Sequence, residues 1–486
     1  MVKRVLVVTF DVVGPKMAGP GIRAWEFARV LGAHFPTTLA APIPVPDNAP
    51  GFAIAPVPIG VGAMERVREL IATHDIVIAQ MLPTDLLEPE IWREKYLMVD
   101  LYCPWMIENL AHYAAEGCTD ADVNWLAHDL EMVRRLTALG DYFFCAGERQ
   151  RAFWLGMLTL QGRLNEAVYA LNADGRALID VVPFGVSATP PLKGANVLKG
   201  VIPGIAAGDF VALWGGGLWN WLDPLTLIRA TALLRDRGYP IRTFFPGTKR
   251  PQATNEETTA PSMVAKVYAL SDELGLTGTH VFFKDWIPYA EWSNYLMEAD
   301  AGISLHLSTL ETRFAFRTRV LEYLRGELVP VVNDGDTIAD LLRAHDAGLI
   351  TPIGDASALA DALALLMDHP EKRARFAEHA RTLAETYTWE KVATPLVAFC
   401  NQPVKGAMHK DPSIRVYEEL TKFRQTLQET SSYAEQLEGE VTRKDAYIAR
   451  LEMQVESEHP QARSLVLLRR FSVREAVSRV LHRRNG

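Results

Sequence analysis

The sequence predicts an α/β protein with two parallel-sheet domains, followed by a separate helical region. Short apolar runs bounded by polar loops alternate with segments of helical periodicity, once over residues 1–186 and again over residues 209–386. This alternation is typical of parallel strands joined by helices. The chain has 486 residues, of which 49% are hydrophobic, so it is long enough to form two cores.

The composition argues against several classes of protein. A net charge of −9 disfavours nucleic-acid binding. The four cysteines show no C-x-x-C spacing, which argues against a zinc site or a disulfide framework and indicates a reducing compartment. The N-terminal apolar run is short and interrupted by Asp11, so it predicts a strand rather than a signal peptide, and no run is long enough to span a bilayer. We therefore expect a cytoplasmic protein.

In the first domain, a strand at residues 5–9 precedes a glycine-containing loop and a helix that begins at Gly21. Strand, glycine loop and helix N-terminus let a backbone approach a phosphate closely. The motif G-P-G-I-R lacks the spacing G-x-G-x-x-G, so a plain turn is the alternative for Gly21. Asp100 ends a later strand and is either a site residue or a cap. One helix is expected over residues 149–173.

Prolines and glycines in residues 187–208 predict a linker to the second domain. That domain opens with a strand at residues 210–214 and three glycines. Lys249 lies in the loop after the next strand. A final apolar helix is expected within residues 387–404.

Residues 300–336 contain the strongest candidate site. Their pattern predicts a strand, a loop, a helix opened by Arg317, Thr318 and Arg319, and a second strand. Ligands bind beyond the carboxyl ends of parallel strands, and helix N-termini attract anions. The two arginines add positive charge there, which predicts a site for a nucleotide diphosphate.

Two acids and a histidine accompany these arginines. Glu311 lies in the preceding loop, and Glu322, about one turn into the helix, can accept hydrogen bonds from ribose hydroxyls. His306 is expected at the strand end, where it either contacts the donor or packs. The alternative for the charged residues is a helix surface with solvated ion pairs.

Residues 412–458 predict a coiled coil, because apolar residues recur four and three positions apart in one register. The register positions are Val416, Leu420, Phe423, Leu427, Thr430, Ala434, Leu437, Val441, Lys444, Ile448, Leu451 and Val455. Such a helix pairs with one or two further copies of the chain. The alternative is a single charged helix packed on the body.

Residues 459–486 form a basic amphipathic tail, with a capping box at Ser472 and Glu475. Basic amphipathic segments suit an anionic membrane surface, which would place the protein at the inner face of a membrane. A solvated end and a protein-docking helix are the alternatives.

Four motifs, in order along the chain, define a resemblance: GPGIRAWEFARVLG, VVPFGV, WGGGLWNWLDPLTLIRA and FKDWIPYAEWSNYLMEADAGISLHLSTLETRFAFRTRVLEYL. Through them, residues 1 to about 400 resemble the GT-B glycosyltransferases of the retaining family-4 type. The resemblance implies two Rossmann-like domains facing across a cleft. It also implies a nucleotide-sugar donor on the second domain, acceptor contacts on the first, and a last helix that crosses back.

Residue by residue, the resemblance assigns Glu322 to the donor ribose, Trp286 and Ile287 to the base, and Gly21 to the diphosphate. Two positions depart from the family pattern. The acid expected eight positions before Glu322 is replaced by Phe314, and Glu311 is the nearest acid.

The expected phosphate-binding Arg and Lys of the second domain are replaced by Leu218 and Asp223. The candidates to supply this charge are Arg317, Arg319 and Lys249.

The resemblance implies transfer of a sugar from a nucleoside-diphosphate donor to a saccharide or lipid-linked saccharide, with retention, in cell-surface polysaccharide synthesis. No metal and no further cofactor are expected. Arg317 and Arg319 would stabilise the leaving diphosphate, and Asp100 would act on the acceptor side. One alternative is a non-catalytic scaffold built on a degenerate transferase, and another is a nucleotide-sugar epimerase. The donor base, the sugar and the acceptor stay open.

Overall fold

The computed structural model describes residues 2–15, 17–46, 49, 51–248, 262–406 and 412–458. The chain forms two units, Met1–Asp411 and Pro412–Gly486. Lys249 and the predicted tail at residues 459–486 lie outside the described residues.

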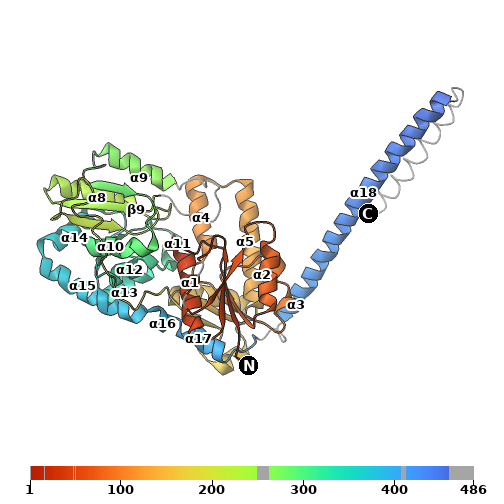
Figure 1. Cartoon of the computed structure of the whole chain (residues 1–486), viewed down its shortest axis with the longest axis horizontal. Helices are drawn as coiled ribbons and strands as arrows, with labels where there is room; N and C mark the ends of the chain where they lie inside the picture. The colour runs from red at the N-terminus through yellow and green to blue at the C-terminus, as the bar shows by residue number, and fades with distance from the viewer. Residues whose placement is uncertain are drawn as a thin grey trace. The chain divides into compact units, whose positions relative to one another are not determined.

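The first unit begins with a seven-stranded parallel sheet in the order β3-β2-β1-β4-β5-β6-β7 (Figure 1). Its strands are β1 Val5–Val8, β2 Thr37–Pro42, β3 Ala53–Val57, β4 Ile76–Ala79, β5 Tyr96–Asp100, β6 Tyr142–Cys145 and β7 Ile179–Val181. The α-helices between them are α1 Gly19–Gly32, α2 Ala63–Ala72, α3 Pro89–Trp92, α4 Trp105–Glu116, α5 Asp120–Leu139, α6 Glu148–Leu160 and α7 Glu166–Leu171.

A second parallel sheet follows, with six strands in the order β10-β9-β8-β11-β12-β13. Its strands are β8 Phe210–Trp214, β9 Ile241–Pro246, β10 Val281–Lys284, β11 Ala301–Ser304, β12 Val329–Asn333 and β13 Leu349–Thr351. Its α-helices are α8 Pro224–Asp236, α9 Ser262–Glu273, α10 Trp292–Glu298, α11 Leu310–Phe314, α12 Thr318–Arg325, α13 Thr337–His345, α14 Ala356–Asp368 and α15 Pro370–Ala384. The prediction of two parallel-sheet α/β domains is confirmed.

The strand order reverses once in each sheet. In the first sheet the reversal lies between β1 and β4, and in the second it lies between β8 and β11. At such a point the two following loops diverge and leave a crevice beyond the carboxyl ends of the strands. The fold therefore places one crevice-forming edge in each domain.

The chain returns to the first domain after α15. Helices α16 Trp389–Val392 and α17 Thr394–Asn401 follow, and both lie near α1 in Figure 1. The buried ring of Trp389 packs edge-on against Phe27, at 5.8 Å between ring centroids, and against Phe184, at 4.8 Å. Burial of these rings holds the end of the first unit on the first domain.

Two local predictions were wrong. The helix expected over residues 149–173 is divided into α6 and α7, because Gly162 has a φ of +71° and Asn165 caps a new helix through its side chain. The loop expected around Glu311 contains α11, which Thr309 caps by accepting a hydrogen bond from the Thr312 backbone N–H. Both errors arise where a capping side chain starts a short helix.

The second unit contains α18 Pro412–Glu458, a helix of 47 residues within the predicted coiled-coil region. Its large apolar side chains are 39% to 61% exposed at the seam positions Leu420, Phe423, Leu427, Leu437, Val441, Ile448, Leu451 and Val455. Pairing of α18 with another helix stays a prediction. Within the described ranges, every helix is too short or too polar to cross a bilayer.

We expect Gly302→Ala to destabilise the second domain, because a Cβ at this position of β11 would overlap the ring of Tyr323. Overpacking of this kind costs about 1–3 kcal/mol. Thermal unfolding of the variant should show a lower Tm than the wild type. Gly156→Ala is the matched control, since a Cβ at this exposed position of α6 meets no atom within 4 Å. An unchanged Tm for Gly302→Ala would contradict the close packing of Tyr323 on β11.

Candidate functional site

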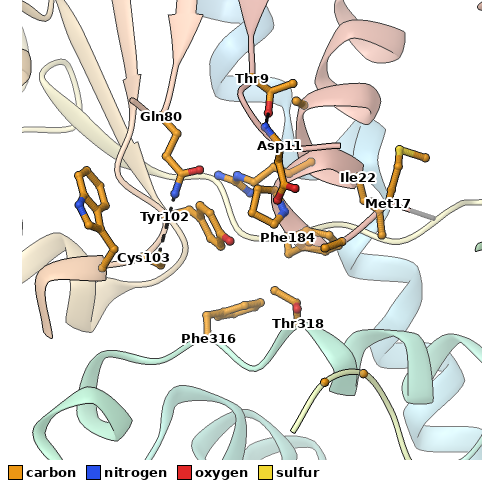
Figure 2. A pocket seen from close by; sticks show the side chains of 18 of the residues that line it. Thr9, Asp11, Met17, Ile22, Gln80, Tyr102, Cys103, Phe184, Phe316 and Thr318 are labelled. Carbon is orange, nitrogen blue, oxygen red and sulfur yellow. Dashed lines mark hydrogen bonds between the residues drawn. The ribbon is translucent and has the colours of Figure 1, made fainter. Parts of the chain in front are cut away.

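A cavity of about 820 Å³ lies between the two domains of the first unit. The loops after β1, β4, β5, β8, β9 and β11 line it, so it joins the two crevice-forming edges. Figure 2 shows Gln80 and Tyr102 of the first domain on one side, and Phe316 and Thr318 of the second domain on the other. This position between facing sheets is the usual place for a ligand in such folds.

Hydrogen bonds cross between the domains beside the cavity. The backbone N–H of Tyr289 donates to the carbonyl of Pro15 at 2.8 Å. The side-chain amide of Gln150 donates to the carbonyl of Phe314, also at 2.8 Å. The two domains are therefore tied together around the cavity in this structure.

A buried ion pair fixes the approach to α12. The two terminal nitrogens of Arg317 donate to the two carboxylate oxygens of Glu311, at 2.8 Å and 2.6 Å. Asp336 lies 3.7 Å from Arg317 Nε and caps α13 through the backbone N–H of Ala339. Arg317 borders the cavity with its charge largely neutralised by these two acids.

His306 lies beneath this network and does not line the cavity. Its ring is 1% exposed, and its Nε2 is 3.8 Å from Asp336. Burial and the neighbouring charge of Arg317 lower the pKa of His306 to about 4. The ring is therefore neutral at physiological pH.

Arg319 presents positive charge to the glycine loop after β8. Its guanidinium carbon is 5.2 Å from the ring centroid of Trp214, and its Nη2 is 3.4 Å from the carbonyl of Gly217. Its Nη1 has no hydrogen-bond partner among the described residues. Burial lowers the pKa of Arg319 to about 10, so the group stays protonated at pH 7. Arg319 therefore has charge and a donor group left for a ligand.

The glycine loop itself has steric requirements. Gly216 has a φ of +88°, a conformation that favours glycine. A Cβ on Gly215 would lie 2.8 Å from the hydroxyl oxygen of Tyr323. That hydroxyl accepts from the Gly215 N–H at 2.6 Å and donates to the Ile303 carbonyl at 2.9 Å. The loop thus brings bare backbone to the cavity opposite Arg319.

The side chains of Leu218 and Asp223, which follow the glycine loop, stabilise the fold and do not line the cavity. Leu218 is buried in the core of the second domain, and Asp223 caps α8 by accepting from the Thr226 N–H at 3.1 Å. Neither side chain replaces the cation expected there. Arg319 approaches the same loop from α12.

The remaining second-domain candidates also border the cavity. Thr318 begins α12, where the first N–H groups have no partner within the helix. Glu322 lines the cavity and accepts from Arg325 at 3.0 Å. Trp286 and Ile287 line it from the loop after β10. These residues, with Arg319 and the glycine loop, can contact one extended anionic ligand.

Two first-domain candidates have structural contacts instead. Gly21 does not line the cavity, and a Cβ there would overlap the carbonyl oxygen of Val12. Asp100 borders the cavity, but Arg23 donates to both of its carboxylate oxygens, at 2.6 Å and 3.0 Å. The phosphate role of Gly21 and the acceptor role of Asp100 stay predictions.

Several residues of the cavity were not among those predicted from the sequence. Arg23 was missed because its partner Asp100 is 77 positions away. Trp219 and Trp221 were missed although they follow the glycine loop directly, within the motif WGGGLWNW. Their position, directly after a strand and a glycine loop, was the sequence signal that could have indicated a place at the cavity.

Within the described ranges, the His, Cys, Asp and Glu side chains form no group of three or more that could hold a metal ion.

Residues 207–383 match the family described as glycosyl transferases group 1. No curated protein matches the chain in sequence. With the two facing parallel-sheet domains, the family match identifies the fold as GT-B. The finer assignment to the retaining family-4 type stays a prediction.

Solved structures agree with this fold. Sucrose-phosphate synthase from Thermosynechococcus elongatus has a TM-score of 0.58 at 12% identity, over 82% of this chain and 98% of that chain. HepE from Anabaena, in complex with UDP-glucose, has a TM-score of 0.56 at 13% identity, over 83% and 100%. WaaG, a glycosyltransferase involved in lipopolysaccharide biosynthesis, has a TM-score of 0.54 at 16% identity, over 81% and 98%. At these identities the likeness establishes the fold alone.

We expect His306 to make stability depend on pH. Its pKa is about 4 in the folded protein against an ordinary value of 6.5, so between these values only the unfolded chain takes up the proton. Stability is therefore complete above pH 6.5 and falls as the pH drops towards 4, by about 2 kcal/mol at pH 5. Urea unfolding at pH 7 and pH 5 should show that His306→Gln loses less stability than the wild type.

His128→Gln, at an exposed position of α5, is the control and should keep the wild-type pH dependence. An NMR titration that gives His306 a pKa near 6.5 would contradict the buried, neutral ring.

Proposed function

We propose that this protein transfers a sugar, with retention, from a nucleoside-diphosphate donor to a saccharide or lipid-linked saccharide. One observation carries the proposal. The N-terminus of α12 and Arg319, whose buried Nη1 has no hydrogen-bond partner among the described residues, border the cavity beside the glycine loop, inside the region that matches the group 1 glycosyl transferases. A diphosphate is the ligand whose charge fits this arrangement.

The donor would lie along one face of the cavity, here called the donor wall: residues 215–217, Thr318, Arg319 and Glu322. The diphosphate would be bound by Arg319, the glycine backbone and the first N–H groups of α12. Glu322 would accept hydrogen bonds from the ribose. Trp286 would lie against the base.

The chemistry requires stabilisation of the departing diphosphate. As the bond between the anomeric carbon and the phosphate oxygen breaks, negative charge develops on the leaving group. Arg319 and the N–H dipoles are fixed in place before reaction, which is the electrostatic contribution that often dominates catalysis. The acceptor hydroxyl would bond to the same face of the anomeric carbon, and its proton would pass to the departing phosphate. Neither step needs a metal ion.

The solved structures offer a first choice of donor. HepE is described in complex with UDP-glucose. WaaG is described as acting in lipopolysaccharide biosynthesis. A uridine-diphosphate sugar and a cell-surface polysaccharide pathway are therefore the first combination to test.

A non-catalytic scaffold remains the second candidate. It is favoured by Leu218 and Asp223, which fill structural roles where the family pattern has cations. A scaffold would not need Arg319 as a charged group. Nucleotide binding and turnover therefore separate the two candidates.

We expect one nucleoside diphosphate among UDP, GDP, ADP, CDP and dTDP to raise the Tm without Mg²⁺. A ligand at about a hundred times its Kd adds roughly 2.7 kcal/mol of stability. Arg319→Gln should weaken that nucleotide by about 10–100-fold, the value of a hydrogen bond to a charged group. Release of the diphosphate from the matching donor sugar should fall at least as much.

Arg313→Gln is the matched control, an exposed arginine on α11 that does not line the cavity. No response to any nucleotide would favour the scaffold, and a response that requires Mg²⁺ would contradict the metal-independent mechanism.

We also propose that α18 pairs with a second copy of the chain. A lone helix of 47 residues, about 70 Å long, is marginal in water unless its apolar face is covered. Its seam follows a 3.5-residue period, which an identical helix matches. In this register Glu419 and Arg424 occupy a g and the next e position, which face each other in a parallel pair.

Light scattering after gel filtration should therefore give a multiple of the monomer mass for the full chain. Replacing Leu427 and Leu451 with Lys should return it to a monomer, because two charges would lie in the seam. Replacing Gln425 and Ala446 with Lys, on the opposite face, is the control and should leave the oligomer intact. A monomeric wild type would contradict the pairing.

A further inference from the structure

Trp219 and Trp221 form an offset stack of two indole rings at the cavity. Their rings are nearly parallel, at an interplanar angle of 3° and a centroid distance of 5.4 Å. Both side chains are half-buried and line the cavity. Their backbones are fixed, since the Trp219 carbonyl accepts from Leu222 and the Trp221 carbonyl accepts from Leu307. A rigid aromatic surface offers apolar contact at little cost in conformational entropy.

The first domain presents polar groups from α4 and α5 to the same cavity. The group Trp105, Glu108 and Asp129, here called the acceptor wall, lines it. The Asp129 carboxylate accepts a hydrogen bond from the side chain of Asn109 at 3.1 Å. This wall supplies mainly hydrogen-bond acceptors.

Trp105 adds an unused donor. Its side chain is 8% exposed, and its indole Nε1–H has no hydrogen-bond partner among the described residues. The Nε1 atom is itself buried, so a ligand oxygen reaches it only when the indole turns towards the cavity. A buried donor without an acceptor is unfavourable, which favours that contact. Together, one donor and several acceptors match hydroxyl groups, which donate and accept.

Charge is divided between the two sides of the cavity. On the first-domain side, Asp11, Glu108 and Asp129 line it. The one cation among the described first-domain lining residues is Arg23, which is bound to Asp100.

The second-domain side is lined by two acids and two arginines. Glu311 is bound to Arg317, and Glu322 is bound to Arg325. Arg319 is therefore left as the lining cation without a carboxylate partner among the described residues. An anionic group would therefore be drawn to the donor wall and repelled from the acceptor wall.

From these contacts we propose that the acceptor is an uncharged saccharide, with one sugar face on the outer face of the Trp219–Trp221 stack and its hydroxyls on the acceptor wall. This rests on the proposed transferase function. The apolar C–H face of a pyranose ring covers an aromatic surface, while its hydroxyls bond to the two carboxylates and to the Trp105 N–H. A sugar phosphate or a uronic acid would place its charge against those carboxylates and bind at least about tenfold more weakly.

The test first separates the acceptor site from the donor site. Binding of the nucleoside diphosphate, followed by thermal shift, reports on the donor wall alone. If no nucleotide binds, the proposed function fails and the acceptor proposal fails with it. If a nucleotide binds, the acceptor is tested on its own.

With the donor sugar present, release of diphosphate is measured on matched pairs of a neutral and an anionic acceptor. The pairs are glucose and glucose 6-phosphate, mannose and mannose 6-phosphate, and galactose and galacturonate. The neutral members are also offered as methyl glycosides and as disaccharides. Stimulation by neutral members, with kcat/KM at least tenfold above that of the anionic partner, is expected. Preference for an anionic member, or stimulation by no member while the nucleotide binds, would overturn the proposal.

Variants then assign the effect to the two walls. Glu108→Lys should reduce or reverse the preference for the neutral member, and Trp221→Ala should raise the acceptor KM about tenfold while nucleotide binding stays unchanged. The controls are Trp125→Ala and Asp120→Asn. Trp125 is a 64% exposed tryptophan of α5 outside the cavity lining, and Asp120 is an exposed acid of the same helix. An unaltered charge preference in Glu108→Lys would overturn the role of the acceptor wall.

Discussion

The donor wall depends on the buried ion pair between Glu311 and Arg317. The pair joins α11 to the residue before α12, so it fixes the direction in which the first turn of α12 points. Removing one partner of such a pair leaves a buried charge and typically costs about 3–5 kcal/mol. Because Glu311 occupies Arg317, the neighbouring Arg319 is left as the cation that can meet a ligand.

The first domain uses a second buried pair in the same way. Arg23 on α1 bonds to both oxygens of Asp100 and to the carbonyls of Val182 and Pro183. Its guanidinium also lies 4.5 Å from the ring centroid of Phe27. One side chain thereby joins a helix, a strand end and the last segment of the domain. Each side of the cavity is thus held by an arginine whose guanidinium nitrogens bond to a buried carboxylate.

The sequence predicted the two sheets because short buried strands have a strong local signature. It also predicted which helix N-terminus borders the cavity, since Arg317, Thr318 and Arg319 directly follow the apolar strand and loop. It did not predict the pairing of Arg23 with Asp100, because that contact depends on tertiary structure and has no local spacing. For His306 the sequence left donor contact and packing open, and the structure shows the packed ring beneath Arg317.

The cross-domain hydrogen bonds from Tyr289 to Pro15 and from Gln150 to Phe314 have a kinetic consequence. Under the proposed function, these bonds oppose any separation of the two domains that accompanies release of the nucleotide. Separation of domains displaces solvent over a large area, so its rate follows the viscosity of the medium, whereas bond making at the anomeric carbon does not. Under the proposed function, a turnover rate that falls with added viscogen would assign the slow step to domain opening, and a constant rate would assign it to chemistry.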